Sequence, residues 1–503
     1  MATQTLEIEQ KYELPSGASL PSLEGLPQVA AVSDSKVETL SAEYYDTEDL
    51  RLLRERITLR RRAGGADEGW HLKLSDQTRQ PGPTSPVELR LPLQRPGHPV
   101  PEELARLVRV HIRDATLRQV ARIETRRRRT ELRDALGGSL AEILTDDVTA
   151  QTFGETTTLS RWSEIEIELT GGSEELMRAA DGRLRNGGLL PAGHAAKLDR
   201  ALAAEPAPER VIRRLTRRST SGEVVLAYLG EQVARLKSLD PAVRRDEPDA
   251  VHQMRVATRR LRSTLQTFPA VLPASATRQL RAELKWLGTV LGEARDIEVL
   301  TGYLRRGLAS APTEFVIGPA QARIVAHYAP REAVARAAVL QVLDSRRYFA
   351  MLDELDRLLH QPPLTAAAAE PAQALGDAVA RAYQRTRRRM RRARRAPAGP
   401  ARDVALHETR KAAKRARYAA EATQQVFGRS ARRFASGMKT VQSLLGDHQD
   451  AVNAQKAARE IGVQAHLARE NAFSFGRLYE RAHRDALEYA DQAIRAWKRA
   501  RSW

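Results

Sequence analysis

The stretch LEIEQKYEL (Leu6–Leu14) alternates charged and apolar side chains along its whole length. One face would carry Glu7, Glu9, Lys11 and Glu13, and the other Leu6, Ile8, Tyr12 and Leu14. A period of two residues is the signature of a β-strand with one buried face. The stretch therefore predicts a strand that presents a mixed acidic and basic row on one side.

The same alternation recurs in several other segments before residue 200. It is found in ITLRRR (Ile57–Arg62), WHLKL (Trp70–Leu74), VELRL (Val87–Leu91), RRRRTEL (Arg126–Leu132), AEILTDD (Ala141–Asp147) and WSEIEIEL (Trp162–Leu169). Within RRRRTEL, Arg126 and Arg128 are expected to share a face. A single strand of this kind is usually half-buried with its charges in water. Seven or more of them, with few long helices between, favour a closed antiparallel sheet.

Closure would place one face of every strand in the lumen of a barrel. If the charged face is the inner one, glutamates and basic side chains meet there. Carboxylates hold hard divalent cations, and arginine and lysine hold phosphate oxygens. The combination favours a ligand made of phosphate and metal, although alternation by itself leaves open which face lies inside.

Taken in order, these motifs resemble the CYTH superfamily, also called the triphosphate tunnel metalloenzymes. Glu7-Ile8-Glu9-Gln10-Lys11 resembles the ExExK signature of that family, and YYDT (Tyr44–Thr47) and the strands above follow in the family's order. The resemblance covers residues 1–203. It implies an antiparallel eight-stranded tunnel that binds a triphosphate together with Mg²⁺ or Mn²⁺.

The resemblance also implies roles for individual side chains. The metal ligands would be Glu7, Glu9, Asp146, Glu166 and Glu168. The triphosphate contacts would be Lys11, Arg60, Arg62, Lys73, Arg90, Arg128 and Lys197. Catalysis would involve Lys11 and one glutamate, either Glu88 or Glu168, that orients or deprotonates the attacking water.

The charge of the chain is divided unevenly. Of its 82 lysines and arginines and 63 aspartates and glutamates, 28 and 33 lie within residues 1–205, which leaves 54 and 30 for the remainder. All of the basic excess therefore belongs to the C-terminal part. The Pro- and Ala-rich stretch AAEPAPER (Ala203–Arg210) predicts a linker over residues 204–214. This linker would join the sheet to an all-helical region over residues 215–503.

The helical region contains an internal duplication. HQMRVATRRLR (His252–Arg262) aligns without a gap with HETRKAAKRAR (His407–Arg417), and LKWLGTVLGEARD (Leu284–Asp296) aligns with MKTVQSLLGDHQD (Met438–Asp450). Residues at i, i+3, i+7 and i+10 share one side of a helix, so each copy carries a basic stripe headed by a histidine. A solvated surface is the usual explanation of one such stripe, but its recurrence in register favours a ligand.

This duplicated unit resembles the CHAD domain, the conserved histidine α-helical domain, over about residues 215–503. The resemblance implies two four-helix bundles related by pseudo-two-fold symmetry, with halves over about 215–361 and 372–503, and a groove that binds inorganic polyphosphate. The groove residues would be His252, Arg255, Arg259, Arg262, Lys285, His407, Arg410, Lys411, Lys414, Arg417 and Lys439. Such a linear polyanion would be held largely by charge.

Other features narrow the class of protein. The chain has no cysteine, which excludes disulfides and thiolate-bound zinc. No segment approaches the ~18 apolar residues of a membrane span, so we expect a soluble cytoplasmic protein, associated with polyphosphate granules if the groove binds polyphosphate. With only 5% aromatic residues, the basic half lacks the stacking side chains of single-strand nucleic-acid binders. The sequence leaves the oligomeric state open.

The leading hypothesis is an α+β multidomain enzyme, a metal-dependent inorganic triphosphatase that hydrolyses tripolyphosphate in the tunnel and binds polyphosphate with its helices. One alternative is a polyphosphate-binding or targeting protein with an idle tunnel. Another is a thiamine triphosphatase or a nucleotide cyclase, because the tunnel residues by themselves do not select among these activities.

Overall fold

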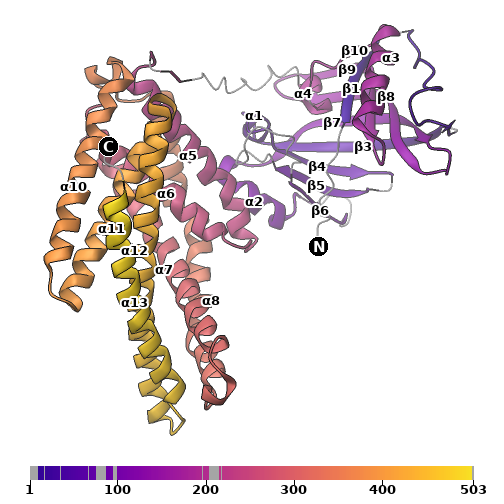
Figure 1. The fold of residues 1–503 in the computed structure, drawn as a ribbon. Helices are drawn as coiled ribbons and strands as arrows, with labels where there is room; N and C mark the ends of the chain where they lie inside the picture. The colour runs from indigo at the N-terminus through magenta and orange to yellow at the C-terminus, as the bar shows by residue number, and fades with distance from the viewer. Residues whose placement is uncertain are drawn as a thin grey trace. The chain divides into compact units, whose positions relative to one another are not determined.

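The computed structural model of the chain describes residues 9–15, 17–33, 35–65, 67–74, 87–93, 99–194, 196–202, 215–216, 218–500 and 503. Glu7 and the predicted linker lie outside these residues. The chain forms two compact units, Met1–Val211 and Ile212–Trp503. The described part of the first is built on a β-sheet, and that of the second is helical (Figure 1).

The first unit contains one antiparallel sheet, which has ten strands among the described residues. They are β1 (Glu9–Leu14), β2 (Ala31–Val32), β3 (Lys36–Asp46), β4 (Thr58–Ala63), β5 (Gly69–Leu74), β6 (Val87–Leu91), β7 (Arg118–Arg133), β8 (Ser139–Phe153), β9 (Thr157–Leu169) and β10 (Leu190–Pro191). Their order is β10-β1-β9-β8-β7-β3-β4-β5-β6, and β2 also pairs with β7.

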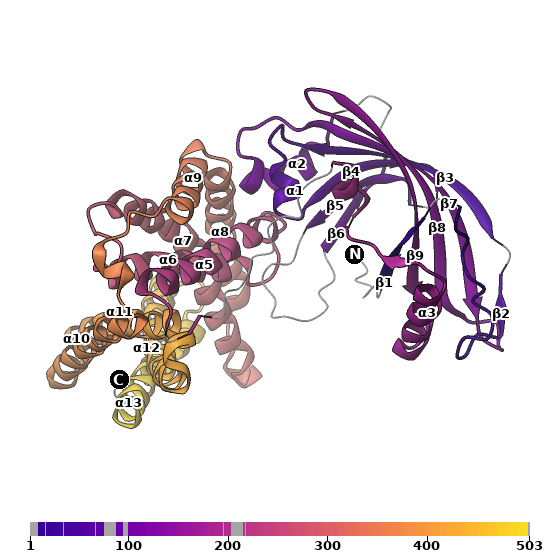
Figure 2. The ribbon, with the colours of Figure 1, turned by 90° about the horizontal axis from the view of Figure 1, so that it is seen from above.

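Two differences from the predicted eight-stranded tunnel follow from this order. The two-residue strands β2 and β10 raise the number of strands to ten. The described pairings also leave β10 and β6 at the two ends of the path, so they do not close the sheet. The sheet is nevertheless strongly curved, as Figure 2 shows, because adjacent strands twist relative to one another.

Apolar side chains at alternate strand positions pack against helices on one face of the sheet. Ile165 and Ile167 of β9 form a buried cluster with Leu184 of α3 (Glu174–Asn186). Leu72 of β5 packs in the same way with Leu104 of α2 (Glu102–Ile112), beside the short α1 (Arg51–Arg54). These helices cover the apolar face, which leaves the charged face for the inside of the curved sheet.

The short helix α4 (Lys197–Ala201) packs on the charged face instead. Its residues Leu198 and Ala201 form a cluster with Ala121 of β7 and Ala150 of β8. The small alanine side chains leave room for a helix against the strands. The first residue of α4, Lys197, is thereby held over the inner face.

The second unit contains nine α-helices among its described residues. They are α5 (Ser221–Arg244), α6 (Ala250–Thr267), α7 (Arg278–Ala309), α8 (Ala320–Leu343), α9 (Arg346–His360), α10 (Leu375–Arg395), α11 (Pro400–Ala422), α12 (Gln424–Leu467) and α13 (Phe473–Arg499). In α12 the chain bends at Gly428, whose φ of 54° and ψ of −122° suit glycine alone. No described helix combines the length and the apolar character needed to cross a bilayer.

The predicted arrangement of four helices in each half is not matched one for one. Five helices, α5–α9, precede α10, and four, α10–α13, make up the remainder, with α12 bent into two segments. Across the halves, α6 packs against α11 and α7 packs against α12. These four helices carry the duplicated motifs, so in each case the helices that carry the two copies of a motif pack against each other.

Candidate functional site

The strand register decides which charged residues share the inside of the sheet, because residues paired across strands lie on the same face. Lys11 pairs with Glu166, Asp146 pairs with Glu164, and Asp146 pairs with Arg127. Followed through β3 to β6, the same face carries Tyr44, Arg60, Arg62, His71, Lys73, Glu88 and Arg90. Glu9 and Glu168, which pair with each other, also belong to it.

Arg128 is the one described strand residue of the predicted site that does not lie on this face. It pairs with Thr145 and is exposed on the opposite side of β7. Its neighbour Arg127 is half-buried on the inner face and pairs with Asp146. Four consecutive arginines fit either register equally well, so only the pairing with β8 identifies Arg127 as the inner residue.

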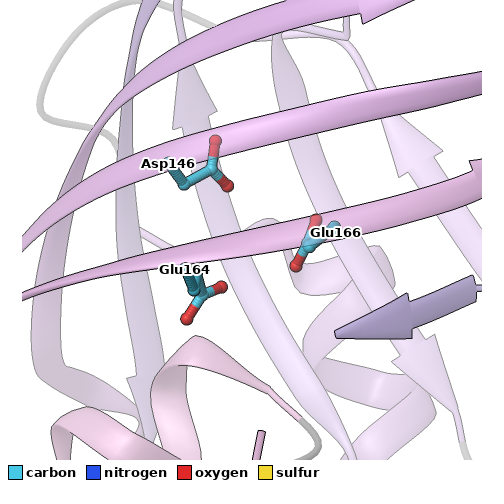
Figure 3. Close-up of side chains that lie close together, drawn as sticks. All are labelled: Asp146, Glu164 and Glu166. Atoms are coloured by element: carbon cyan, nitrogen blue, oxygen red, sulfur yellow. The ribbon is translucent and has the colours of Figure 1, made fainter. Parts of the chain in front are cut away.

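Three buried carboxylates form the centre of the inner face. Asp146 comes from β8, and Glu164 and Glu166 come from β9, each offering an oxygen within 4.8 Å of the others (Figure 3). Hard divalent cations such as Mg²⁺ prefer oxygen ligands of this kind, so the donor set fits the metal that the CYTH resemblance implies. Asp146 and Glu166 are among the predicted metal ligands, whereas Glu164 is not, although its alternation with Glu166 and Glu168 could have indicated it.

Lys197 reaches into this carboxylate cluster from α4. Its Nζ lies 2.9 Å from Asp146 Oδ2, 2.6 Å from Glu164 Oε1 and 2.9 Å from Glu166 Oε1. Burial by itself lowers the pKa of Lys197, but the three carboxylates outweigh it and hold that pKa above its ordinary value. Lys197, a predicted triphosphate contact, therefore lies directly beside the three central carboxylates.

Arg127 and Lys11 complete the balance of charge around the cluster. Arg127 donates to both oxygens of Asp146, at 2.8 and 2.7 Å, and to Glu166 Oε2 at 3.2 Å. Lys11 Nζ lies 3.1 Å from Glu166 Oε1 and 3.4 Å from Glu9 Oε1. Burial raises the pKa of Glu166, but Lys197, Lys11 and Arg127 together bring it well below its ordinary value. Glu166 is therefore ionised and able to bind a cation at neutral pH.

A second group on the inner face surrounds Glu88. Its carboxylate oxygens lie 2.9 Å from His71 Nδ1, 2.8 Å from Arg90 Nη2 and 3.9 Å from Arg60 Nη2. Burial raises the pKa of Glu88, but the bonds from His71 and Arg90 and the charge of Lys73 bring it well below its ordinary value. An ideal general base has a pKa near the working pH, so this carboxylate is better suited to orienting water than to removing a proton.

His71 and Tyr44 are inner-face residues absent from the predicted site. The buried His71 has acceptors at both ring nitrogens, Glu88 at Nδ1 and the Asp67 carbonyl oxygen at Nε2, 2.8 Å away. An ionised carboxylate and a carbonyl oxygen both accept hydrogen bonds, so these two partners fix the orientation of the His71 ring on the inner face. Burial raises the pKa of the Tyr44 phenol, but Arg60, Arg62 and Lys197 outweigh it and lower that pKa.

The helical unit gathers basic side chains where α6 meets α11. This basic cluster consists of Arg255 and Arg259 of α6 and of Arg410 and Lys414 of α11. These side chains lie close enough for their positive charges to repel one another. Burial and these three arginines hold the pKa of Lys414 well below its ordinary value, against the weaker effect of Asp450. The cluster therefore favours an anion of high charge.

The other predicted groove residues differ in their surroundings. Lys285, Lys439 and Lys411 are exposed, and Lys411 also pairs with Glu408 at 2.8 Å. Arg262 is half-buried near Arg259, whereas Arg417 is held by Glu421 at 2.6 Å. The half-buried His252 and His407 each keep a buried Nδ1 without a hydrogen-bond partner among the described residues.

Comparison with known proteins identifies both units. A family model for the CYTH domain matches residues 5–183, and one for the CHAD domain matches residues 227–459. The uncharacterized protein Rv2226 of Mycobacterium tuberculosis strain H37Rv is 37% identical over 97% of this chain and 97% of its own length, as is the uncharacterized protein MT2285 of strain CDC 1551. The chain belongs to the family of these proteins and contains a CYTH domain followed by a CHAD domain.

Several solved structures resemble parts of the chain. The CHAD domain of the plant Ricinus communis is 29% identical over 57% of this chain and 95% of its own, with a TM-score of 0.46. PptA from Streptomyces chartreusis is 23% identical over 56% of this chain and 100% of its own, also with a TM-score of 0.46. HpAC1 from Hippeastrum, described as a putative adenylyl cyclase with dominant triphosphatase activity, is 18% identical over 40% of this chain and 99% of its own. Its TM-score is 0.24.

Proposed function

We propose that this protein is a metal-dependent inorganic triphosphatase whose helical domain binds polyphosphate. The observation that carries the proposal is the inner face of the sheet, where three buried carboxylates lie beside an arc of lysine and arginine side chains. The CYTH family includes triphosphatases and cyclases and depends on metal. The catalytic domain would span residues 1–203 and the helical domain residues 215–503.

The carboxylates and the cations would have separate tasks. Asp146, Glu164 and Glu166 would hold Mg²⁺ or Mn²⁺, together with Glu9, Glu168 and the undescribed Glu7. The metal would supply charge that neutralises phosphate oxygens and aligns the leaving group. Arg60, Arg62 and Lys73 would bind the remaining phosphate oxygens from the facing strands, aided by Arg90, Arg127, Lys11 and Lys197.

Cleavage of a phosphoanhydride depends mainly on positioning and on charge. Glu88 would orient the attacking water, because His71 and Arg90 fix its carboxylate and keep it ionised. Glu168, which lies on the same face opposite Glu9, is the alternative. Comparison of Glu88→Gln with Glu168→Gln would separate them, since the water-orienting residue affects kcat more than KM.

A substrate panel tests the activity of the full chain. Tripolyphosphate, long-chain polyphosphate, ATP and thiamine triphosphate would each be supplied with Mg²⁺ and with Mn²⁺, and phosphate or cyclic nucleotide release measured. Fastest release from tripolyphosphate is the expected result. If substitution of Glu166 does not reduce phosphate release from any substrate, the triphosphatase proposal is rejected. Preferred turnover of another substrate would assign the chain to that activity instead.

Polyphosphate binding by the helical domain is tested by calorimetry with the full chain. Reversing the charge of Arg255, Arg259, Arg410 and Lys414 together should abolish binding of long-chain polyphosphate, because the cluster would then repel the polyanion. Competition with duplex DNA at the same salt distinguishes a polyphosphate groove from a nucleic-acid site. Binding of this kind would support our proposal of a cytoplasmic protein that associates with polyphosphate granules.

One observation favours a second candidate, a polyphosphate-binding protein with an idle tunnel. The ammonium group of Lys197 already contacts all three central carboxylates and offsets their charge. Titration with Mn²⁺ and Mg²⁺ in the presence and absence of tripolyphosphate tests this candidate. An active tunnel should bind metal more tightly when the phosphate is present to attract Lys197, whereas an idle tunnel should bind none in either case.

A further inference from the structure

The contacts between the two halves of the helical domain are reciprocal. Arg260 of α6 donates to Glu421 of α11 at 3.1 Å, and Arg415 of α11 donates to Gln266 of α6 at 3.0 Å. In the sequence duplication Arg260 corresponds to Arg415, and Gln266 corresponds to Glu421. Each contact is thus repeated with the partners exchanged, which is the property of a two-fold interface.

The two central arginines are seated in the same way in both halves. Arg255 lies against Gly292 of α7, where an added Cβ would come within 3.3 Å of its guanidinium nitrogens. Arg410 lies against Gly446 of α12, where the corresponding distance is 3.2 Å. Gly292 and Gly446 occupy equivalent positions of the duplication, and the missing side chain lets each guanidinium lie close to the helix backbone.

An aspartate one turn further along completes each seat. Arg255 Nη1 is 3.4 Å from Asp296 Oδ1, and Asp296 is the main group that opposes the lowering of the pKa of Arg255 by burial. Asp450, the equivalent of Asp296, likewise opposes the lowering of the pKa of Arg410 by burial, together with Asp296 and Asp447. The charge of Arg410 also acts on Arg255, so the two seats are neighbours across the interface.

We propose that Arg255 and Arg410 form a single two-fold site that recognises a polyanion whose two chain directions are chemically equivalent. This inference rests on the proposed polyphosphate-binding function and deepens it. A linear inorganic polyphosphate reads the same from either end, so each half of the site meets the same phosphate geometry in both directions. A nucleic acid strand has distinct 5′ and 3′ directions and would fit the two halves unequally.

Substitutions between the two copies limit the symmetry, and three of them involve residues that take part in contacts between the two halves. Arg259 corresponds to Lys414, Ser263 to Tyr418, and Gln266 to Glu421. The Tyr418 hydroxyl accepts a hydrogen bond from Arg259 at 2.9 Å, so this part of the second copy stabilises the first. These three differences lie one or more turns away from Arg255 and Arg410. The residues that directly follow the two arginines, Val256 and Lys411, also differ, but the glycine and aspartate partners are the same in both copies.

Matched variants of the full chain test the equivalence of the two seats. Arg255→Gln and Arg410→Gln should each weaken binding of long-chain polyphosphate by about tenfold, because each removes one charge-assisted contact, and the two losses should agree within threefold. Gly292→Ala and Gly446→Ala should weaken it less, again equally. Arg391→Gln, at an exposed position of α10, is the charge-matched control. A tenfold or greater difference between the two arginine variants would overturn the inference.

Fluorescence energy transfer tests the direction of the bound chain. The protein has no cysteine, so Thr289→Cys on α7 and Ser443→Cys on α12 would each provide one label at equivalent, exposed positions. With polyphosphate labelled at a single end, both labelled proteins should give the same distribution of transfer efficiencies. High transfer in one protein and low transfer in the other would show a fixed direction and refute the inference while leaving polyphosphate binding intact. If the full chain does not bind polyphosphate at all, both this inference and the proposed polyphosphate-binding function are rejected.

Discussion

Two partly buried lysines, one in each domain, show how differently the two domains surround a positive charge. Lys197 in the CYTH domain is surrounded by carboxylates, and its pKa is raised. Lys414 in the CHAD domain is surrounded by arginines, and its pKa is lowered. Burial disfavours the charged form of both, so the sign of the neighbouring charge decides the outcome.

The comparison indicates what each site requires from its ligand. The CYTH inner face carries its own carboxylates, so in the proposed function it would bind a metal before or together with the phosphate. The CHAD cluster holds arginines together with few acids, so the proposed polyanion would supply the missing negative charge. The two proposed phosphate sites would thus rest on opposite electrostatic principles, one suited to chemistry and the other to binding.

The largest expected effect is on stability, where the two lysines should respond in opposite directions. Lys197→Met leaves three buried carboxylates without their shared cation and should lower the free energy of unfolding of its domain by about 3 kcal/mol. Lys414→Met removes a poorly solvated charge and should raise that of its domain by about 1 kcal/mol at pH 7. Urea unfolding followed by peptide-resolved hydrogen exchange reports each domain separately.

The pH dependence of the free energy of unfolding provides the control for this comparison of the two lysines. The folded state disfavours protonated Lys414, so the destabilisation exists below its unfolded pKa of about 10.5 and is lost as pH rises toward that value. The gain from Lys414→Met should accordingly vanish near pH 10.5. Equal responses of the two lysine variants at pH 7 would contradict the contrast between the domains.

Glu166→Gln should separate the two functions. Loss of one central carboxylate is expected to reduce metal-dependent phosphate release by about 100-fold, because an amide is a poorer ligand for a hard cation. Polyphosphate binding by the helical domain should not change. Glu124→Gln, on the exposed outer face of β7, is the matched control. Activity of the Glu166 variant within threefold of the unaltered chain would argue against the carboxylate cluster as the metal site.

The neighbouring arginines Arg127 and Arg128 sharpen the assignment of the inner face. Arg127→Gln should lower kcat/KM for tripolyphosphate by roughly tenfold, through the lost contacts to Asp146 and Glu166 and the lost positive charge. Arg128→Gln should leave it within twofold, because that side chain lies on the outer face. Steady-state kinetics of both variants in parallel provide the measurement, and the reverse ranking would refute the register of β7.

Proton uptake on binding is the smallest expected effect. Lys414 faces Arg410 on its own helix, Arg255 and Arg259 on α6 and Asp450 on α12. A bound polyanion offsets the arginines and raises the pKa of Lys414, so binding should take up a fraction of a proton and weaken as pH rises. Calorimetry in two buffers of different ionisation enthalpy measures this uptake. Lys414→Arg should abolish it, and identical heats for the unaltered chain in both buffers would exclude it.

Much of the architecture could be predicted from residue order. The alternation in residues 6–14 and 162–169 follows from the two-residue period of a strand. The first stretch contributes β1 (Glu9–Leu14), the second lies within β9 (Thr157–Leu169), and the two strands pair with each other. The internal duplication likewise identified the helices that pack across the CHAD domain. Such local periods are written in consecutive residues, so they need no knowledge of the fold.

The sequence therefore determined the families of the two domains, the charged rows and the repeated basic stripes. Only the tertiary structure decided that Arg127 faces inward, that His71 bridges Glu88 and a backbone carbonyl, and that Lys197 returns to carboxylates contributed by β8 and β9. These outcomes depend on strand register and on side chains far apart in the chain. Their charge states follow from the neighbours that folding supplies, which no local pattern contains.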